Sequence, residues 1–429
     1  MRKWLLISWL SISSATIART QVTELWSSGL TNLWHSDPLT TSNDQDTYYY
    51  ETTATVDWDG NTFVSGLITS FDLGVSSPFI AKFDARGRKL WESEADWPYP
   101  DDLAADQRGD VFLSGRLDVQ STNYAVLVKL TDHGQELWRI LQPSAGGSFV
   151  LGTAEAARQD SQGNSFFLVY TPNHQLSISK ISRRGQVLWQ RYLPTKQYAD
   201  VEEGFTKSIS MTSDNGVAIA GGYLLPSKYV AFVTKYDANG NALWWSEDFT
   251  GGEEPFFYSS VMTGARGTIC AAAVARFVTT FSDSGRAIHT DGTIGGQVVA
   301  TSNDGGFLLR NGGFIYAMNV WGRLQWTGGF NALEDLIGVV PNGRGGWLAA
   351  GQSGSDSTSL LFVSVDGRGR PLWQASLGNY PYEADVWVHE YNKLLRAPDG
   401  TYRVVMTMPR SYPGGVAVVA VGLDRPCGR

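Results

Sequence analysis

The chain of 429 residues carries 34 basic and 42 acidic side chains, which gives a formal charge of −8 and an isoelectric point near 5.2. This acidic balance argues against nucleic acid as a partner, because binding to phosphates needs a basic surface. Hydrophobic residues make up 42% of the chain, enough to bury a large core, and the two cysteines exclude a disulfide-rich scaffold or a cysteine zinc cluster.

Residues 1–18 have the pattern of a signal peptide for export. Arg2 and Lys3 precede an apolar stretch from Trp4 to Ile17, and a small residue at Ala18 suits cleavage by signal peptidase. The alternative is a membrane anchor, but this stretch is too short to cross about 30 Å of hydrocarbon. We therefore expect a protein secreted to the periplasm or the extracellular space, which begins near residue 19 and has no membrane span.

The rest of the chain, residues 19–429, repeats a pair of hairpin signals. The first signal is an Asp-Gly or Asn-Gly turn between strand-like runs, where glycine takes a positive φ at little cost. Its eight copies lie at 57–60, 106–109, 160–163, 213–216, 265–267, 303–305, 342–345 and 398–400. Eight evenly spread turns of this kind predict eight copies of one small β-unit.

The second signal follows each turn and ends in an aromatic ring, as in the stretch from Lys82 to Trp91. His289 takes the place of that ring in the fifth unit. The rings in the other units are Trp91, Trp138, Trp189, Trp244, Trp326 and Trp373. Two hairpins per unit make four short strands, and radial repetition of such units predicts a β-propeller. One ring per unit at a fixed offset favours packing between blades over an array for stacking sugars.

The eighth unit predicts how the ring of blades closes. The chain ends before this unit reaches its fourth strand, and residues 31–34 match the Leu-Trp ends of the other units. Trp26 lies more residues before the first turn than the ring of any other unit lies before the turn that follows it. We therefore expect the strand around Trp34 to complete the last blade. That pairing would remove two open sheet edges. The sequence predicts an all-β fold: a single eight-bladed propeller of four-stranded blades, closed by the N-terminal strand.

Together, the two signals resemble the repeats of secreted bacterial β-propellers of the SBBP and delta-60 type, across residues 30–429. They are also similar to the quinoprotein-like repeat, whose tryptophan packs between neighbouring blades. The resemblance implies a propeller and leaves its activity open, because propellers host many functions. The spacing from Asp84 to Trp91 is one residue shorter than in the quinoprotein repeat. The adjacent cysteine pair that accompanies a quinone is missing, so we expect no bound pyrroloquinoline quinone.

Few residues point to recognisable chemistry. The five histidines lack metal-binding spacing. Cys270 and Cys427 lie three blade steps apart, so we expect no internal disulfide. The best enzymatic cluster lies where the last connection meets the first, and its residues are His35, His389, Glu390 and Tyr391.

Charge is divided unevenly between the two expected faces of the ring. The connections between units hold 22 of the 42 acids and three bases, a formal charge of −19 that leaves +11 on the rest of the chain. These connections are residues 35–51, 92–102, 139–151, 190–204, 246–257, 290–296, 327–335 and 374–391. Basic residues of the opposite turns are Arg86, Arg88, Lys89, Arg108, Arg183, Arg184, Arg266, Arg344, Arg368 and Arg370. Solubility alone could explain charged loops.

The acidic connections also carry aromatic rings, and acids beside exposed rings suit a carbohydrate or a cation. We expect a ligand site where two connections converge over the centre of the ring, made by Trp97, Tyr99, Asp101, Tyr380, Tyr382, Glu383 and Trp387. The sequence thus predicts a secreted, monomeric binding or scaffold protein that takes a glycan, a peptide or another protein ligand, with calcium as the only cofactor that this face suggests. The alternatives are a carbohydrate-active lyase or hydrolase on the same face and, third, a quinone dehydrogenase.

Overall fold

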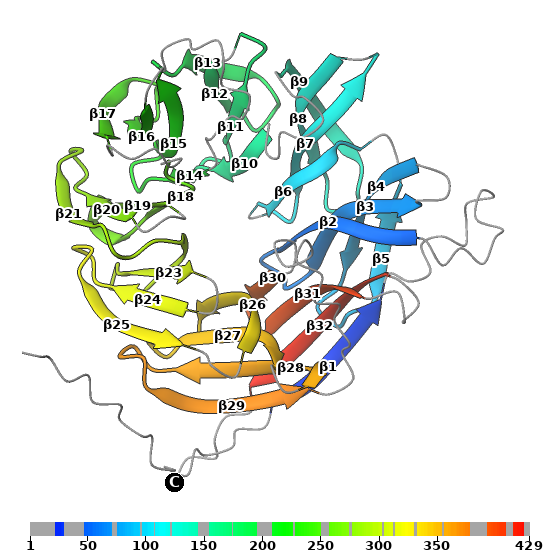
Figure 1. Ribbon diagram of the computed structural model, residues 1–429. Coiled ribbons are helices and arrows are strands. Elements are labelled where there is room, and N and C mark those ends of the chain that lie inside the picture. Colours follow the sequence, from blue (N-terminus) through cyan, green and yellow to red (C-terminus); the bar gives the residue numbers. More distant parts are fainter. Residues whose placement is uncertain are drawn as a thin grey trace, which may run out of the picture.

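The structure is a computed structural model. It describes residues 22–29, 47–70, 75–94, 97–106, 108–120, 122–144, 154–173, 175–194, 208–225, 228–249, 257–273, 277–302, 304–311, 314–329, 333–353, 356–377, 393–408 and 415–423. Within these ranges the chain forms 32 strands and one short 3-10 turn at Ala265–Gly267. The strands make eight antiparallel sheets of four strands each, arranged in a ring (Figure 1). The predicted eight-bladed β-propeller is therefore confirmed.

Each blade has four strands, called A to D from the centre of the ring outward, and these are consecutive in the chain in blades 1 to 7. Blade 1 consists of β2 (Thr47–Val56), β3 (Thr62–Ser70), β4 (Val75–Phe83) and β5 (Lys89–Ser93). Blade 2 consists of β6 (Tyr99–Ala105), β7 (Val111–Val119), β8 (Thr122–Leu130) and β9 (Glu136–Pro143). Blade 3 consists of β10 (Ala154–Gln159), β11 (Ser165–Tyr170), β12 (Leu176–Ile181) and β13 (Val187–Tyr192). Blade 4 consists of β14 (Ser208–Met211), β15 (Val217–Leu225), β16 (Lys228–Tyr236) and β17 (Ala242–Phe249).

The second half of the ring repeats this order. Blade 5 consists of β18 (Ser260–Thr263), β19 (Ile269–Ala273), β20 (Phe277–Phe281) and β21 (Ala287–Asp291). Blade 6 consists of β22 (Gln297–Thr301), β23 (Phe307–Asn311), β24 (Phe314–Met318) and β25 (Leu324–Gly329). Blade 7 consists of β26 (Leu333–Pro341), β27 (Trp347–Ser353), β28 (Asp356–Val365) and β29 (Pro371–Leu377). Blade 8 consists of β30 (Lys393–Arg396), β31 (Tyr402–Met408), β32 (Gly415–Leu423) and β1 (Val22–Gly29).

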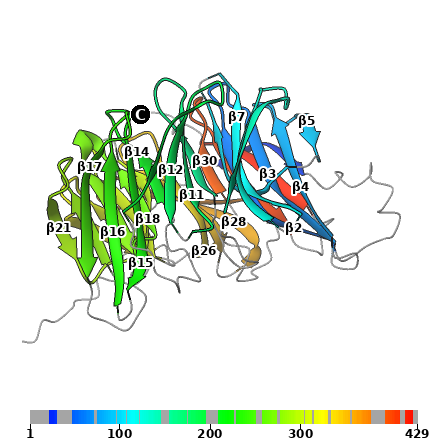
Figure 2. The ribbon, with the colours of Figure 1, turned by 90° about the horizontal axis from the view of Figure 1, so that it is seen from above.

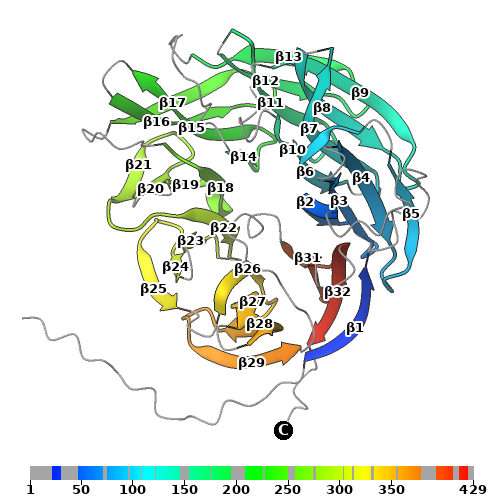
Figure 3. The same cartoon turned by 45° about the vertical axis from the view of Figure 1, so that its right-hand side comes forward.

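The N-terminal strand closes the ring, but it is not the strand that the sequence indicated. β1 pairs with β32, and Trp26 lies opposite Ala420 in the register that places Trp91 opposite Lys82 in blade 1. The two strands lie side by side in Figures 1 and 3. The expectation of a closing strand at Trp34 was therefore wrong, and Trp34 lies outside the described residues. The spacing argument failed because the segment from β1 to β2 is longer than the connections elsewhere.

The A–B and C–D turns lie together on one face of the ring, which we call the turn face, and the connections between blades lie on the other, the connection face. Figure 2 shows strands running between the two. The tight turns form as predicted because a side chain holds the backbone: Asp57 Oδ1 accepts hydrogen bonds from the amides of Asp59 and Asn61. Gly60 takes a φ of +81° there, which an L side chain rarely adopts. In blade 4 this conformation falls on Asn215 instead of Gly216.

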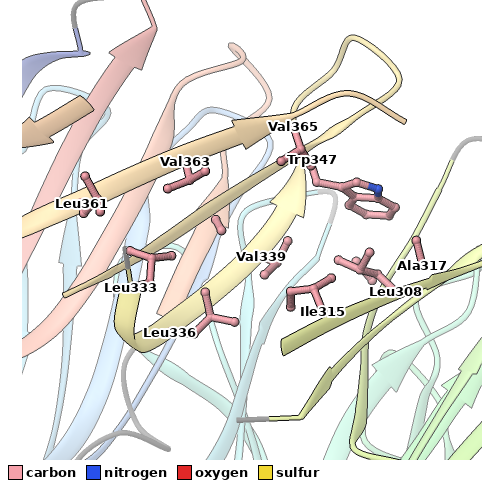
Figure 4. Close-up of a cluster of buried hydrophobic side chains, with 12 residues drawn as sticks. Leu308, Ile315, Ala317, Leu333, Leu336, Val339, Trp347, Leu361, Val363 and Val365 are labelled. Carbon is pink, nitrogen blue, oxygen red and sulfur yellow. The ribbon is translucent and has the colours of Figure 1, made fainter. Parts of the chain in front are cut away.

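The core lies between neighbouring blades. Most sheets bury both faces against their neighbours, so the B and C strands are largely apolar; Val126, Leu127 and Val128 of β8 have no exposed surface. One such layer joins blades 6 and 7, where the indole of Trp347 extends toward Leu308 and Ala317 (Figure 4). The ring is stable only as a whole, because no blade can bury its faces alone.

Candidate functional site

The turn face is held together by tryptophans that reach from one blade to the next. The indole Nε1 of Trp91 donates a hydrogen bond to the carbonyl oxygen of Asp132, in the C–D turn of the next blade, at 2.8 Å. Trp138, Trp189, Trp244 and Trp326 make the same bond at 2.9–3.1 Å to Arg183, Ala238, Asp283 and Gly367. These five rings therefore lie between neighbouring blades, and each of them is half-buried rather than fully buried.

Close approach of each ring requires a glycine in the neighbouring turn. A Cβ added to Gly185 would lie 2.7 Å from Cγ of Trp138, and Gly185 already has a φ of +80°. His289 occupies the tryptophan slot of blade 5 and pairs with Thr280. Among the predicted rings that the structure describes, Trp373 of blade 7 is the most deeply buried, at 9% exposure.

Buried lysines stand opposite the tryptophans in blades 1 to 4. These residues are 1–4% exposed, and they are Lys82, Lys129, Lys180 and Lys235. The Nζ atom of Lys180 lies 2.9 Å from Oδ2 of Asp160 in the A–B turn of its own blade. It also donates a hydrogen bond to the carbonyl oxygen of Ala238 in the next blade, at 3.1 Å. A buried cation that is paired in this way links two blades.

The pKa values of Asp160 in blade 3 and Asp214 in blade 4 lie below the usual aspartate value, so both carboxylates are ionised. Burial alone would raise the pKa of Asp160, but hydrogen bonds from Lys180 and Asn164 outweigh it and bring the pKa below its usual value. In blade 4, burial tends to lower the pKa of Lys235, and the hydrogen bonds to Asp214 and Asp283 raise it instead. The ammonium of Lys235 lies 2.8 and 2.6 Å from those two carboxylates. These charges stabilise the turn face, so they are not free to act on a ligand.

A cavity of about 640 Å³ opens on the turn face between blades 6 and 7. Residues from the A–B and C–D turns of both blades line it, together with the aromatic rings of Phe307, Trp326 and Trp347. Arg396, at the end of β30 in blade 8, lies at its edge. The sequence did not predict this cavity. The only available signal was the short sixth unit, which carries Ala317 where the first four units have lysine.

On the connection side of blade 4, an exposed glutamate lies among aromatic rings. Oε1 of Glu247 accepts hydrogen bonds from the hydroxyl of Tyr223 at 2.6 Å and from Nε1 of Trp245 at 2.8 Å. The ring of Trp245 stacks on Phe232, with centroids 4.5 Å apart and planes at 10°. Trp245 itself is half-buried. This is the acid-and-aromatic chemistry that the sequence predicted for this face, in a blade that the prediction did not name.

Three residues of the expected ligand site lie in the described part of the chain. Trp97 is only 6% exposed, so its ring differs from the exposed stacking surface that the sequence indicated. It packs with Leu103 in the core between blades 1 and 2, and its Nε1 donates to Oγ of Ser93 at 3.2 Å. Tyr99 is half-buried, with the Arg116 guanidinium 5.4 Å from its ring centroid, and Asp101 is exposed at a bulge in β6.

The other candidates lie outside the described residues. They are Tyr380, Tyr382, Glu383 and Trp387 of the ligand site and His35, His389, Glu390 and Tyr391 of the enzymatic cluster. The ligand site and the carbohydrate-active alternative therefore stay predictions. Residues 1–18 and Cys427 also lie outside. Cys270 is a free cysteine in the core, where burial raises the pKa of its thiol to about 12.

Charge is less cleanly separated between the faces than the sequence suggested. Several acids assigned to connections lie in strands: Glu51, Glu92, Asp101, Asp102, Glu247, Asp248, Asp291, Glu334 and Asp335. Bases of the turn face pair with acids of the same turns, as Arg88 does with Asp84 and Arg370 with Asp366, each at 2.7 Å. Tyr258, which directly follows the connection 246–257, is fully buried and donates a hydrogen bond to Asp248.

Neither a metal site nor a membrane helix is found in the part of the chain that the structure describes. No group of three or more His, Cys, Asp or Glu side chains is placed there to hold a metal ion. Within the same ranges no helix has the length and apolar character needed to cross a membrane. The expected calcium ion thus has no assigned ligands and stays a prediction.

Comparison with known proteins supports the fold. No protein-family model matches the sequence, and no curated protein matches it significantly. Among solved structures, the chain is similar to BamB from Moraxella catarrhalis, at 12% identity over 93% of this chain and 99% of that one, with a TM-score of 0.54. Sqt1 from Chaetomium thermophilum gives 11% identity over 89% and 97% of the two chains, with a TM-score of 0.52.

Identities this low establish shared architecture alone. Fold and turn-face geometry together define this chain as an eight-bladed β-propeller whose blades are joined by a repeated tryptophan contact. A propeller fold fits a binding or scaffold role. The finer resemblance to the SBBP, delta-60 or quinoprotein-like repeats is not decided by these comparisons.

Proposed function

We propose that this chain is an exported binding or scaffold propeller that takes an uncharged oligosaccharide on its connection face. The observation that carries the proposal is the position of Glu247, an exposed carboxylate held by Tyr223 and Trp245. Sugar rings stack on aromatic faces while carboxylates accept hydrogen bonds from their hydroxyl groups. Both elements are present within one blade, and the acidic, aromatic connections of the other blades supply more of the same chemistry.

The charges of this face favour neutral or cationic ligands over polyanions. The residues that the sequence assigns to this face carry a formal charge of −19, which repels uronate-rich or sulfated chains at a range of about 8 Å in physiological salt. Export is part of the proposal and depends on the pattern of residues 1–18. Calcium is the cation that this face would hold, because carboxylates are its usual ligands.

The test is a glycan array followed by calorimetry on purified protein, with and without added calcium. We expect binding to a neutral oligosaccharide and a loss of about tenfold or more in Trp245→Ala, since a stacked ring contributes on the order of 1–2 kcal/mol. The control is Trp321→Ala, which removes a ring that is 47% exposed in the C–D turn of blade 6. Binding only to heparin-like or uronate-rich polymers would refute the assignment, and so would unchanged binding by Trp245→Ala.

A further inference from the structure

Blades 4 and 6 share the same A–B turn. In blade 4, Asp214 accepts hydrogen bonds from the hydroxyl of Thr212 and from the amide of Gly216. In blade 6, Asp304 accepts them from Ser302 and Gly306. The two turns therefore hold their carboxylates in equivalent places on the turn face.

The two blades differ in the residue of strand C that faces this carboxylate. Lys235 pairs with Trp244 in blade 4, and Ala317 pairs with Trp326 in blade 6, in the same register. The Lys235 ammonium lies 2.8 Å from the Asp214 carboxylate. Blade 6 has the carboxylate but lacks the lysine, and the cavity of about 640 Å³ includes both Ala317 and Asp304 in its wall.

Two groups at the cavity, the Asp304 carboxylate and the carbonyl oxygen of Gly367, can still accept hydrogen bonds from an ammonium group. The hydrogen bond from Ser302 lowers the pKa of Asp304, so its carboxylate is ionised. The carbonyl oxygen of Gly367 accepts from Nε1 of Trp326 at 3.0 Å. Its equivalent in blade 4, the carbonyl oxygen of Ala238, accepts from both Trp189 and Lys180, each at 3.1 Å. A carbonyl oxygen has two lone pairs, so Gly367 can likewise take a second donor.

The walls of the cavity suit a short aliphatic chain. The rings of Trp326 and Trp347 both line it, and indoles pack well against methylene groups and attract a nearby cation. The turns of blade 7 contribute Gly343 and Gly367, which leave space where side chains would stand. A lysine side chain fills the equivalent space in blades 1 to 4, which sets the length of chain that this place accepts.

Two guanidinium groups at the cavity favour an anion at the other end of the ligand. Arg368 and Arg396 both line it and both are exposed. The Arg396 side chain lies against Gly343, where an added Cβ would be 2.5 Å from Nη2. An amine alone would meet two positive charges here. An amine that also carries a carboxylate would offset them, because arginine binds carboxylates through paired hydrogen bonds.

We propose that the cavity between blades 6 and 7 binds an ω-amino carboxylate: a primary ammonium joined to a carboxylate by a short aliphatic chain, as in lysine or the C-terminal lysine of a peptide. The ammonium takes the place of the absent lysine side chain, between Asp304 and the Gly367 carbonyl. The chain lies against Trp326 and Trp347, and the carboxylate lies at Arg368 and Arg396. This site is on the turn face and is independent of the oligosaccharide proposed for the connection face.

Calorimetry with 6-aminohexanoate tests the proposal. We expect binding by the full chain, with hexylamine and hexanoate each weaker by about tenfold or more, because each lacks one charged hydrogen-bonded end. Asp304→Asn should weaken binding by a similar factor. Ala317→Lys should abolish it by filling the cavity with the side chain found in blade 4. The matched control is Asp214→Asn, which changes the equivalent turn where Lys235 fills the space, and it should bind as the unchanged protein does.

Two further ligands, free lysine and a peptide that ends in lysine, separate the sources of the ligand. Every variant is first shown to be folded by its melting temperature. Tighter binding of a peptide ending in lysine than of free lysine assigns a protein partner, and equal binding assigns the free amino acid. The proposal is overturned if 6-aminohexanoate does not bind, or if Ala317→Lys binds it as the unchanged protein does. It is also overturned if hexanoate binds equally well, because the cavity would then be an anion site. None of these results depends on binding at the connection face.

Discussion

The indole Nε1 of Trp189 in blade 3 donates a hydrogen bond to the carbonyl oxygen of Ala238 in blade 4, at 3.1 Å. The two residues are 49 positions apart in the chain, and the bond links the outer strand of one blade to the C–D turn of the next. Five blades make this bond to their neighbour in the described part of the chain. It is the contact by which the repeated tryptophan holds the ring together.

We expect Trp189→Phe to lower the free energy of unfolding by about 1 kcal/mol, because the ring remains but its hydrogen bond is lost. Urea unfolding followed by circular dichroism measures the change. Trp321→Phe is the control, since this exposed ring lies in a turn, and it should change stability by less than about 0.5 kcal/mol. Equal effects of the two substitutions would show that the interblade bond contributes nothing.

Lys180→Met should destabilise the protein by about 3 kcal/mol at neutral pH, because it leaves the carboxylate of Asp160 buried without its cation. The side chain of Asp160 has no exposed surface, so water cannot replace the lysine. Lys89→Met removes an exposed surface cation and serves as the control. A loss below about 0.5 kcal/mol in Lys180→Met would contradict the role of the buried pair.

The same pair predicts a dependence on pH. The folded-state pKa of Asp160 lies below its unfolded value, so its stabilisation is complete above the unfolded pKa and is lost as the pH falls through the folded one. Lys180→Met removes a donor that lowers this pKa. The stability difference between the two proteins should therefore be largest near neutral pH and should shrink below about pH 4. Unfolding curves at several pH values measure it, and a difference that grows on acidification would contradict the assignment.

Cys270 should resist thiol reagents in the folded protein. Burial raises the pKa of its thiol to about 12, so almost no thiolate is present at pH 8, and no surface is open to the reagent. Labelling with a chromogenic disulfide in a Cys427→Ser background should proceed only after unfolding by denaturant. Rapid labelling of the native protein would show that the core between blades 5 and 6 opens readily.

Much of this fold could be predicted from the sequence because the same signals for turns and rings recur in eight units. Each turn needs a residue with positive φ, and each blade needs a ring at one register position, so Gly60 and Trp91 recur at fixed offsets. The closing strand was predicted wrongly because the spacing from the ring of one blade to the first turn of the next is regular only where the blades are joined by a short connection. The segment that joins β1 to β2 is longer than the connections between consecutive blades, so the spacing favoured Trp34 over Trp26.

The candidate site was harder to predict because burial depends on neighbours that the sequence does not show. Trp97 belongs to an acidic connection and Tyr258 directly follows one, yet both pack into the core between blades. The contact of Glu247 with Tyr223 joins strands β17 and β15, which are 24 positions apart. The cavity at Ala317 was visible in the sequence only as a missing lysine, and its meaning depends on the filled equivalent at Lys235.

The closed ring is tested most directly by hydrogen exchange at β32. This strand lies between β31 and β1, so its amides are shared between two partners. Deleting residues 22–29 should remove protection from the β32 amides that bond to β1 and leave those that bond to β31 protected. Deleting residues 31–40 should leave both sets protected. Unchanged protection after the first deletion, or its loss only after the second, would contradict closure of the propeller by β1.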